Sequence, residues 1–178
     1  MPEGIDEFNP NIHSPNLPVG LSQIVKDLDS INHYLNKNNV TLILSSFPML
    51  AEDSLFENGL KYASVYSYWI HDFGKVPLSV IRRFNKFENL VLKKYAIANN
   101  VEFINIAEDL TKVPPAFIDG VHLSSDGLKL HAWSVFTQIL PLIEKQISLN
   151  YLPQNRKQKD AFHPYISNSL PRTVLQLN

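Results

Sequence analysis

An acidic residue and a histidine three positions apart form the arrangement in this sequence that is best suited to chemistry. They stand in the run Asp119-Gly120-Val121-His122, between an apolar segment and a final helical pattern. The carboxylate of Asp119 can reach back within one turn of chain and accept the Nδ1 proton of His122, which leaves Nε2 as a general base. The same spacing also fits a turn in which Asp119 binds local backbone amides and His122 is only partly exposed.

Other residues are weaker candidates. Asp126 and His131 could join His122 in a metal site, but without a His-x-x-x-His pair a solvated helix histidine is the simpler interpretation. Ser45 and Ser46 are the only serines at the end of an expected strand, where a nucleophile could sit, and the polar end of a strand explains them equally well. The aromatic residues between positions 62 and 69 could line a pocket, although such clusters more often belong to the core.

Hydrophobic periodicity predicts the elements that must position Asp119 and His122. Apolar residues at helical spacing indicate helices over residues 21–36, over residues 77–98 and from Ser124 or Ser125 onward. Pro141 is expected to kink the last helix or to end its regular part. Two apolar, β-rich runs, residues 40–47 and 101–106, indicate strands, and the first is typical of a strand buried on both faces.

This alternation of helices and strands predicts an α/β fold with parallel strands, in which ligands bind at the carboxyl ends of the strands. Two strands are few for so many helices. Either short strands are hidden in the polar-aromatic stretch 51–75, which we expect to hold a helix and irregular segments, or part of the fold lies outside these residues. We expect one domain over residues 1–149 and an extended tail over residues 150–178.

Composition excludes several classes of function. The 178 residues are 44% hydrophobic, which is enough for a core, and 16 basic against 17 acidic residues give a net charge of −1. No overall field therefore favours nucleic acid or an anionic membrane, and no apolar run is long enough to span a bilayer. Without cysteine there is no disulfide and no thiolate nucleophile, and the compartment stays open.

Residues 117–128, Phe-Ile-Asp-Gly-Val-His-Leu-Ser-Ser-Asp-Gly-Leu, resemble the C-terminal block of the SGNH (GDSL-type) hydrolases, in which an Asp-x-x-His loop supplies two members of a Ser-His-Asp triad. The helix and strand over residues 85–105 and the strand over residues 42–48 are similar to those that precede this block. The resemblance covers roughly residues 4–148. It implies a flavodoxin-like three-layer sandwich, Asp119 and His122 as catalytic residues, a small carboxylic ester as substrate, and neither a metal nor an organic cofactor.

Two departures from the family pattern affect this expectation. The sequence has no Gly-Asp-Ser nucleophile motif and no Gly-x-Ser-x-Gly alternative. Gly4-Ile5-Asp6-Glu7 is similar to the family's oxyanion-hole block, with Asp6 where an asparagine would stand, and an ionised aspartate cannot donate a hydrogen bond to an oxyanion. A flexible N-terminus is the other interpretation of Gly4 to Glu7. The resemblance implies a partial domain that lacks the first strand and its serine.

Three hypotheses follow for the function. The first is an ester hydrolase whose serine lies outside this sequence, and the second is a catalytically inactive member of the family that binds or assembles. The third is self-association, or association with another protein, through an exposed edge of the sheet. The sequence does not specify the acyl group, nor whether the acyl group passes to water or to another alcohol.

Overall fold

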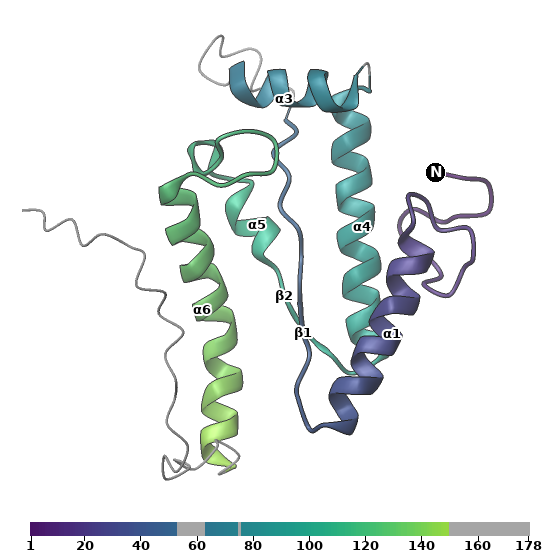
Figure 1. Cartoon of the computed structure of the whole chain (residues 1–178), viewed down its shortest axis with the longest axis vertical. Coiled ribbons are helices and arrows are strands. Elements are labelled where there is room, and N and C mark those ends of the chain that lie inside the picture. Colours follow the sequence, from purple (N-terminus) through teal and green to yellow (C-terminus); the bar gives the residue numbers. More distant parts are fainter. Residues whose placement is uncertain (53–62, 75, 150–178) are drawn as a thin grey trace, which may run out of the picture. The chain divides into compact units, whose positions relative to one another are not determined.

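The computed structural model describes residues 1–52, 63–74 and 76–149, and it has a mixed α/β fold that is mostly helical (Figure 1). Its elements, in chain order, are α1 (Leu21–Lys37), β1 (Ile43–Ser45), α3 (Ala63–Phe73), α4 (Leu78–Ala98), β2 (Glu102–Ile104), α5 (Ile106–Leu110), the 3-10 helix η2 (Pro114–Ala116) and α6 (Ser125–Ser148). One compact unit comprises Met1–Leu142, and a second begins at Ile143. The expected tail over residues 150–178 lies outside the described residues.

The helices expected over residues 21–36 and 77–98 are present as α1 and α4, and the same device ends both. Asn39 and Asn100 take left-handed backbone angles, with φ of 55° and 51°. The N–H group of the following valine then reaches back to the helix, at 2.9 Å from Val40 to Leu35 and at 2.8 Å from Val101 to Ala96. Asparagine tolerates this conformation better than most residues, so each Asn-Asn-Val run stops a helix and turns the chain into a strand.

β1 and β2 pair in parallel, as expected, with Leu44 opposite Phe103 and Ser45 opposite Ile104. They are three residues each, and within the described residues they form the whole sheet. The prediction that the first strand is buried on both faces was wrong, because Ile43 and Ser45 are exposed. Within the described residues β1 has a strand neighbour on one side, and Ile43 and Ser45 stay exposed although Ile104 of β2, on the same face, is buried.

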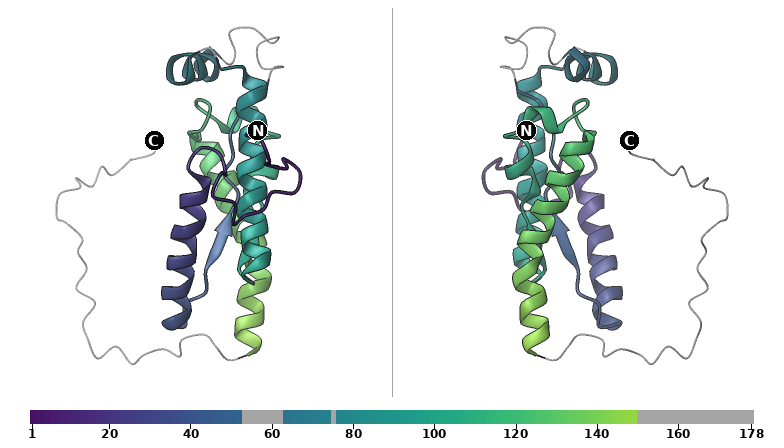
Figure 2. Two further views of the ribbon diagram at one scale, coloured as in Figure 1. Left: turned by 90° about the vertical axis from the view of Figure 1, so that its right-hand side faces the viewer. Right: turned by 90° about the vertical axis from the view of Figure 1, so that its left-hand side faces the viewer.

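Two hydrophobic clusters hold the helices to the sheet. In the first cluster α1 and α4 pack with the N-terminal segment and with Leu44 of β1, and in Figure 2 the arrow of β1 appears between these two helices. The second cluster joins Ile104 of β2 to α3, α5, the segment after β1, and the inner residues of α6. Leu44 and Ile104 stand one register position apart and therefore point to opposite faces of the sheet. Helices consequently pack against both faces.

The last helix begins where expected, since the Ser124 hydroxyl accepts a hydrogen bond from the Gly127 N–H group at 3.0 Å. Pro141 does not end it, because the helix runs on to Ser148. The buried side of this helix is not simply its apolar side, because Leu128 is exposed, whereas Gly127 and Ser134 are buried. α6 carries apolar residues around most of its circumference, so periodicity did not single out the side that packs.

The polar-aromatic stretch 51–75 contains the expected helix as α3, while residues 53–62 and 75, Tyr62 among them, lie outside the described residues. Trp69 is a core residue with 2% of its surface exposed. The hydrophobic pattern did not predict α5 or η2, which follow β2 in the chain. Among the described residues no helix has the length and apolar character needed to cross a membrane.

Candidate functional site

The loop after η2 brings Asp119 and His122 into direct contact. The Nδ1 atom of His122 lies 2.8 Å from Oδ2 of Asp119. Oδ1 of the same carboxylate accepts the backbone N–H groups of Val121 at 2.9 Å and of His122 at 2.8 Å. Three N–H groups therefore hold one carboxylate, and the two arrangements that the spacing suggested, an amide-binding turn and an aspartate–histidine pair, occur together.

The backbone closes this loop into a rigid turn. Phe117 and Leu123 form an antiparallel bridge, and the Ile118 N–H group donates to the His122 carbonyl at 2.9 Å. Just outside the bridge, the Ser124 N–H group donates to the Ala116 carbonyl at 2.8 Å, and the Ser124 side chain then begins α6. The acid and the histidine are thus anchored between η2 and a long helix.

The electrostatics of the loop keep Asp119 ionised at neutral pH. Partial burial by itself raises the pKa of the Asp119 carboxyl, but hydrogen bonds from the His122 and Val121 amides and from the imidazole outweigh it and lower the pKa below its usual value. An ionised carboxylate can only accept, so Nδ1 of His122 must carry a proton. In neutral histidine, Nε2 then holds the free lone pair.

The Nε2 atom is available to a ligand. It makes no hydrogen bond within residues 1–52, 63–74 and 76–149, and the His122 side chain is 70% exposed, against 22% for Asp119. The only ring beside it that the described residues supply is Tyr68 of α3, whose centroid lies 6.3 Å away in an edge-to-face arrangement. The sequence marked Tyr68 as part of an aromatic cluster, but nothing in that cluster pointed to the loop fifty residues further along.

Asp6 and Gly4, the expected oxyanion-hole positions, lie elsewhere in the first compact unit. The N-terminal segment that contains them packs with α1 and α4, whereas the Asp119 loop adjoins the cluster built by α3 and α6. Oδ1 of Asp6 accepts the N–H groups of Phe8 at 2.9 Å and Asn9 at 3.1 Å. In the described part of the chain no hydrogen bond joins Asp6 or Gly4 to the Asp119–His122 pair.

Ser46, one of the two serines considered as a nucleophile, has a structural partner on each side of its hydroxyl. Its Oγ accepts the Ala107 N–H group at 2.8 Å and donates to Oδ1 of Asn105 at 3.0 Å. The residue is 2% exposed. Ser46 therefore caps the first turn of α5 from the neighbouring strand, while Ser45 is exposed and makes no hydrogen bond through its hydroxyl within the described residues.

The histidine and aspartate of α6 do not form a metal site with His122. Asp126 pairs with Lys129 at 2.8 Å. Across the three described ranges, no group of three or more histidine, aspartate or glutamate side chains could hold a metal ion.

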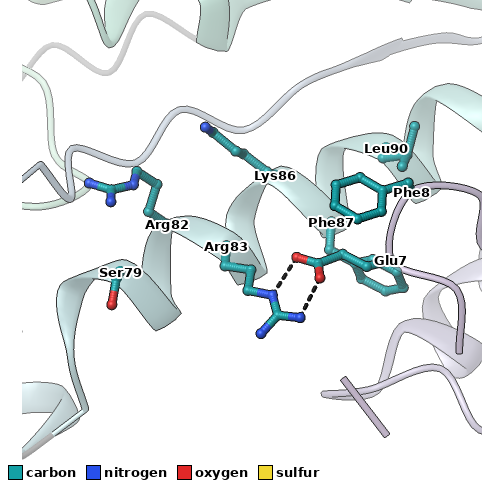
Figure 3. Close-up of a pocket in the computed structure, with 8 residues that line it drawn as sticks. All are labelled: Glu7, Phe8, Ser79, Arg82, Arg83, Lys86, Phe87 and Leu90. Atoms are coloured by element: carbon teal, nitrogen blue, oxygen red, sulfur yellow. Dashed lines mark hydrogen bonds and ion pairs between the residues drawn. The ribbon is translucent and has the colours of Figure 1, made fainter. Parts of the chain in front are cut away.

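Two surface pockets flank α4. One, of about 360 Å³, lies between the N-terminal segment and α4, and a bidentate ion pair of Glu7 with Arg83 forms one wall beside the exposed ring of Phe8 (Figure 3). The other, of about 320 Å³, opens at the carboxyl ends of both strands, where Asn105 and Glu108 face α4. Neither pocket is lined by Asp119 or His122.

The chain matches no family model, no curated protein and no solved structure.

The chemistry open to this site follows from its atoms. A histidine with Nδ1 held by an ionised carboxylate and Nε2 exposed can take a proton from a hydroxyl group or a water molecule and return it to a leaving group. The described residues place no serine, threonine or second acid in hydrogen-bond contact with Nε2. The pair could therefore serve in acid–base chemistry, and none of the hydrogen bonds of the described residues supplies it with a nucleophile.

Proposed function

We propose that Asp119 and His122 are the acid–base pair of an ester hydrolase of the SGNH (GDSL) type. The observation that carries this proposal is the 2.8 Å contact between Oδ2 of Asp119 and Nδ1 of His122, with Nε2 exposed. In the reaction, Nε2 takes the proton of a serine hydroxyl as its oxygen attacks the ester carbonyl carbon. The C–O bond to the alcohol breaks, the imidazolium protonates the departing oxygen, and water later releases the acid by the same route.

The fold supports this proposal in outline. Parallel strands with helices on both faces are compatible with an SGNH-like three-layer sandwich, and the Asp119 loop follows the second strand by way of α5 and η2. Ser46 does not suit the role of nucleophile, since it is buried and caps α5, so the proposal requires a different serine as the nucleophile. The substrate class is a small carboxylic ester.

The test is ester hydrolysis by the complete native gene product, with p-nitrophenyl acetate as the substrate. We expect His122→Ala to lower kcat/KM by about 100-fold or more, because general acid–base catalysis by one positioned side chain contributes about that factor. Asp119→Asn should also lower kcat, because its single acceptor oxygen is taken by the two backbone amides and its NH2 group then donates to Nδ1, which leaves the neutral imidazole in the wrong tautomer. His131→Ala, on α6, is the matched control. Equal turnover by wild type and His122→Ala, or no turnover at all, would refute the proposal.

One observation favours a second candidate, a catalytically inactive protein that binds or assembles. Asp6, at the position expected for the oxyanion donor, acts as a hydrogen-bond acceptor for the Phe8 and Asn9 amides. A fluorophosphonate probe that labels active serine hydrolases should then leave the native protein unmodified. Stoichiometric labelling would exclude this candidate.

A further inference from the structure

Helix α3 fixes the backbone around the Asp119 loop at two points. The Ser64 hydroxyl donates to the Ile118 carbonyl at 2.7 Å, one residue before Asp119. The Trp69 indole donates to the Leu50 carbonyl at 2.8 Å, and the Leu50 N–H group in turn donates to the Gly120 carbonyl at 2.8 Å. The first bond is direct, and the second passes through the segment that follows β1.

Trp69 also supports the loop by close packing. A Cβ atom at position 120 would overlap the six-membered part of the indole ring, so only glycine allows the loop to lie this close to Trp69. The indole is buried, with 2% of its surface exposed. Gly120 therefore lies directly against a buried side chain, which restricts where the neighbouring Asp119 can lie.

Tyr68 completes the arrangement on the side of the imidazole. Its ring meets the His122 ring edge to face, with centroids 6.3 Å apart and planes at 87°. The same ring packs against Trp69, with centroids 5.0 Å apart and planes at 72°. Tyr68 is therefore packed against a buried neighbour on one side and contacts the exposed imidazole on the other.

We propose that Tyr68 is a positioning residue for His122, holding the plane of the imidazole so that Nδ1 faces Asp119. The hydrogen bond to Asp119 restrains one ring nitrogen only, and a side chain that is 70% exposed has little other packing to stop it from rotating. An edge-to-face contact supplies that restraint, because it is directional. The expected effect of Tyr68 on catalysis rests on the proposed function, whereas its effect on the orientation of the His122 ring does not.

The tautomer of His122 reports this restraint directly. When the carboxylate holds Nδ1–H, the neutral ring is locked in the Nδ1–H form, and a ring that rotates away is free to take the Nε2–H form. Nitrogen-15 chemical shifts of the labelled, neutral imidazole measure the ratio of the two forms. His122→Ala assigns the signals, and Asp119→Ala, which leaves no side-chain partner for Nδ1, gives the ratio for the unrestrained ring.

We expect Tyr68→Leu to lower the ratio of the Nδ1–H to the Nε2–H form by about 2- to 10-fold, the range that an aromatic pair contributes. Tyr68→Phe keeps the ring and should leave the ratio unchanged. Tyr68→Met serves as the second ring-less variant should Tyr68→Leu fail to fold. An unchanged ratio in a folded ring-less variant, or the same loss in Tyr68→Phe, would overturn the proposal.

Ester turnover separates this proposal from the function on which it rests. In an active protein, Tyr68→Leu should lower kcat and leave KM nearly unchanged, with Tyr68→Phe close to wild type. A protein without esterase activity in which Tyr68→Leu still shifts the tautomer ratio would refute the hydrolase function and keep the positioning role. An active esterase in which Tyr68→Leu leaves the tautomer ratio unchanged would keep the hydrolase function and refute the positioning role.

Discussion

The two oxygens of the Asp119 carboxylate have different partners, which explains how one residue can shape a turn and orient a histidine. Oδ1 takes two backbone amides, which fixes the direction of the carboxylate, and Oδ2 is then aimed at Nδ1 of His122. A glutamate or an asparagine could not do both, since the first is longer and the second has one acceptor oxygen. The sequence motif contained this information only as two competing interpretations.

The lowered pKa of Asp119 makes a prediction about stability and pH. A carboxyl group whose pKa is lower in the folded than in the unfolded state stabilises the fold above its unfolded pKa, near 3.8, and loses this contribution as the pH falls through the folded value. Asp119→Asn should therefore reduce the free energy of unfolding at pH 7, and the gap to wild type should close below about pH 4. Urea unfolding of both proteins at several pH values measures this difference in the free energy of unfolding. A difference that widened in acid would contradict a lowered pKa for Asp119.

At the scale of the element, α5 is a five-residue helix whose first turn is capped by a residue far away in sequence. Its own N-cap position, Asn105, makes no capping hydrogen bond, and Ser46 supplies the acceptor for Ala107 instead. The same hydroxyl links the ends of β1 and β2 through Asn105. One buried serine thus ties a strand, its neighbour and the following helix together.

Ser46→Ala should destabilise the protein by about 1–3 kcal/mol, because it leaves the Ala107 N–H group and the Asn105 carboxamide oxygen without their partner. Ser45→Ala is a matched control on the adjacent residue, which is exposed, and should change stability by less than about 0.5 kcal/mol. Chemical denaturation measures the free energy of unfolding of the two variants and of wild type. Equal effects would show that the Ser46 hydroxyl does not cap α5.

α6 gives a second prediction at this scale, one that reverses the usual helix preference. Alanine normally stabilises a helix relative to glycine by about 1 kcal/mol, but a Cβ atom at Gly127 would collide with the Ala116 carbonyl. Gly127→Ala should therefore destabilise by about 1–3 kcal/mol, the usual cost of overpacking. Ser125→Ala, exposed in the same turn, is the control, and a Gly127→Ala variant more stable than wild type would show that the two elements are further apart.

At the scale of the whole molecule, some apolar side chains pack into two hydrophobic clusters and others stay exposed to solvent. The described part of α6 exposes Trp133 at 63% and Phe136 at 48%, and their rings lie against each other with centroids 6.1 Å apart. Leu128 is exposed as well, and so is Ile43 of β1. Parallel sheets and the helices around them are usually covered on both faces, so this surface departs from the usual pattern.

The two tryptophans of the chain lie in opposite environments, which makes fluorescence a direct test of the packing. Trp69 is 2% exposed and Trp133 is 63% exposed. Trp133→Phe should leave a blue-shifted emission that acrylamide quenches poorly, and Trp69→Phe should leave a red-shifted emission that acrylamide quenches strongly. A blue-shifted, protected Trp133 would mean that another molecule or segment covers this face of α6 in solution.

The sequence was sufficient wherever the signal was local. The extents of α1 and α4, the Ser124 cap and the contact of Asp119 with His122 all depend on residues close together in the chain. The remaining features depend on contacts between residues far apart in the chain. No local pattern could show that Ser46 caps a helix sixty residues away, or that Tyr68 meets His122, and periodicity could not choose the packed side of α6 because apolar residues surround it.

The carboxamides of α4 limit how this sheet can grow. The Ser46 N–H group donates to Ile104 of β2, so the next residue, Phe47, directs its backbone away from β2. There Asn89 accepts the Phe47 N–H group at 2.7 Å and donates to its carbonyl at 2.9 Å, copying the pairing that a third strand would offer. The β1 edge is thus closed at Phe47, and a further strand at this edge could pair only alongside Ile43 to Ser45, which limits its length.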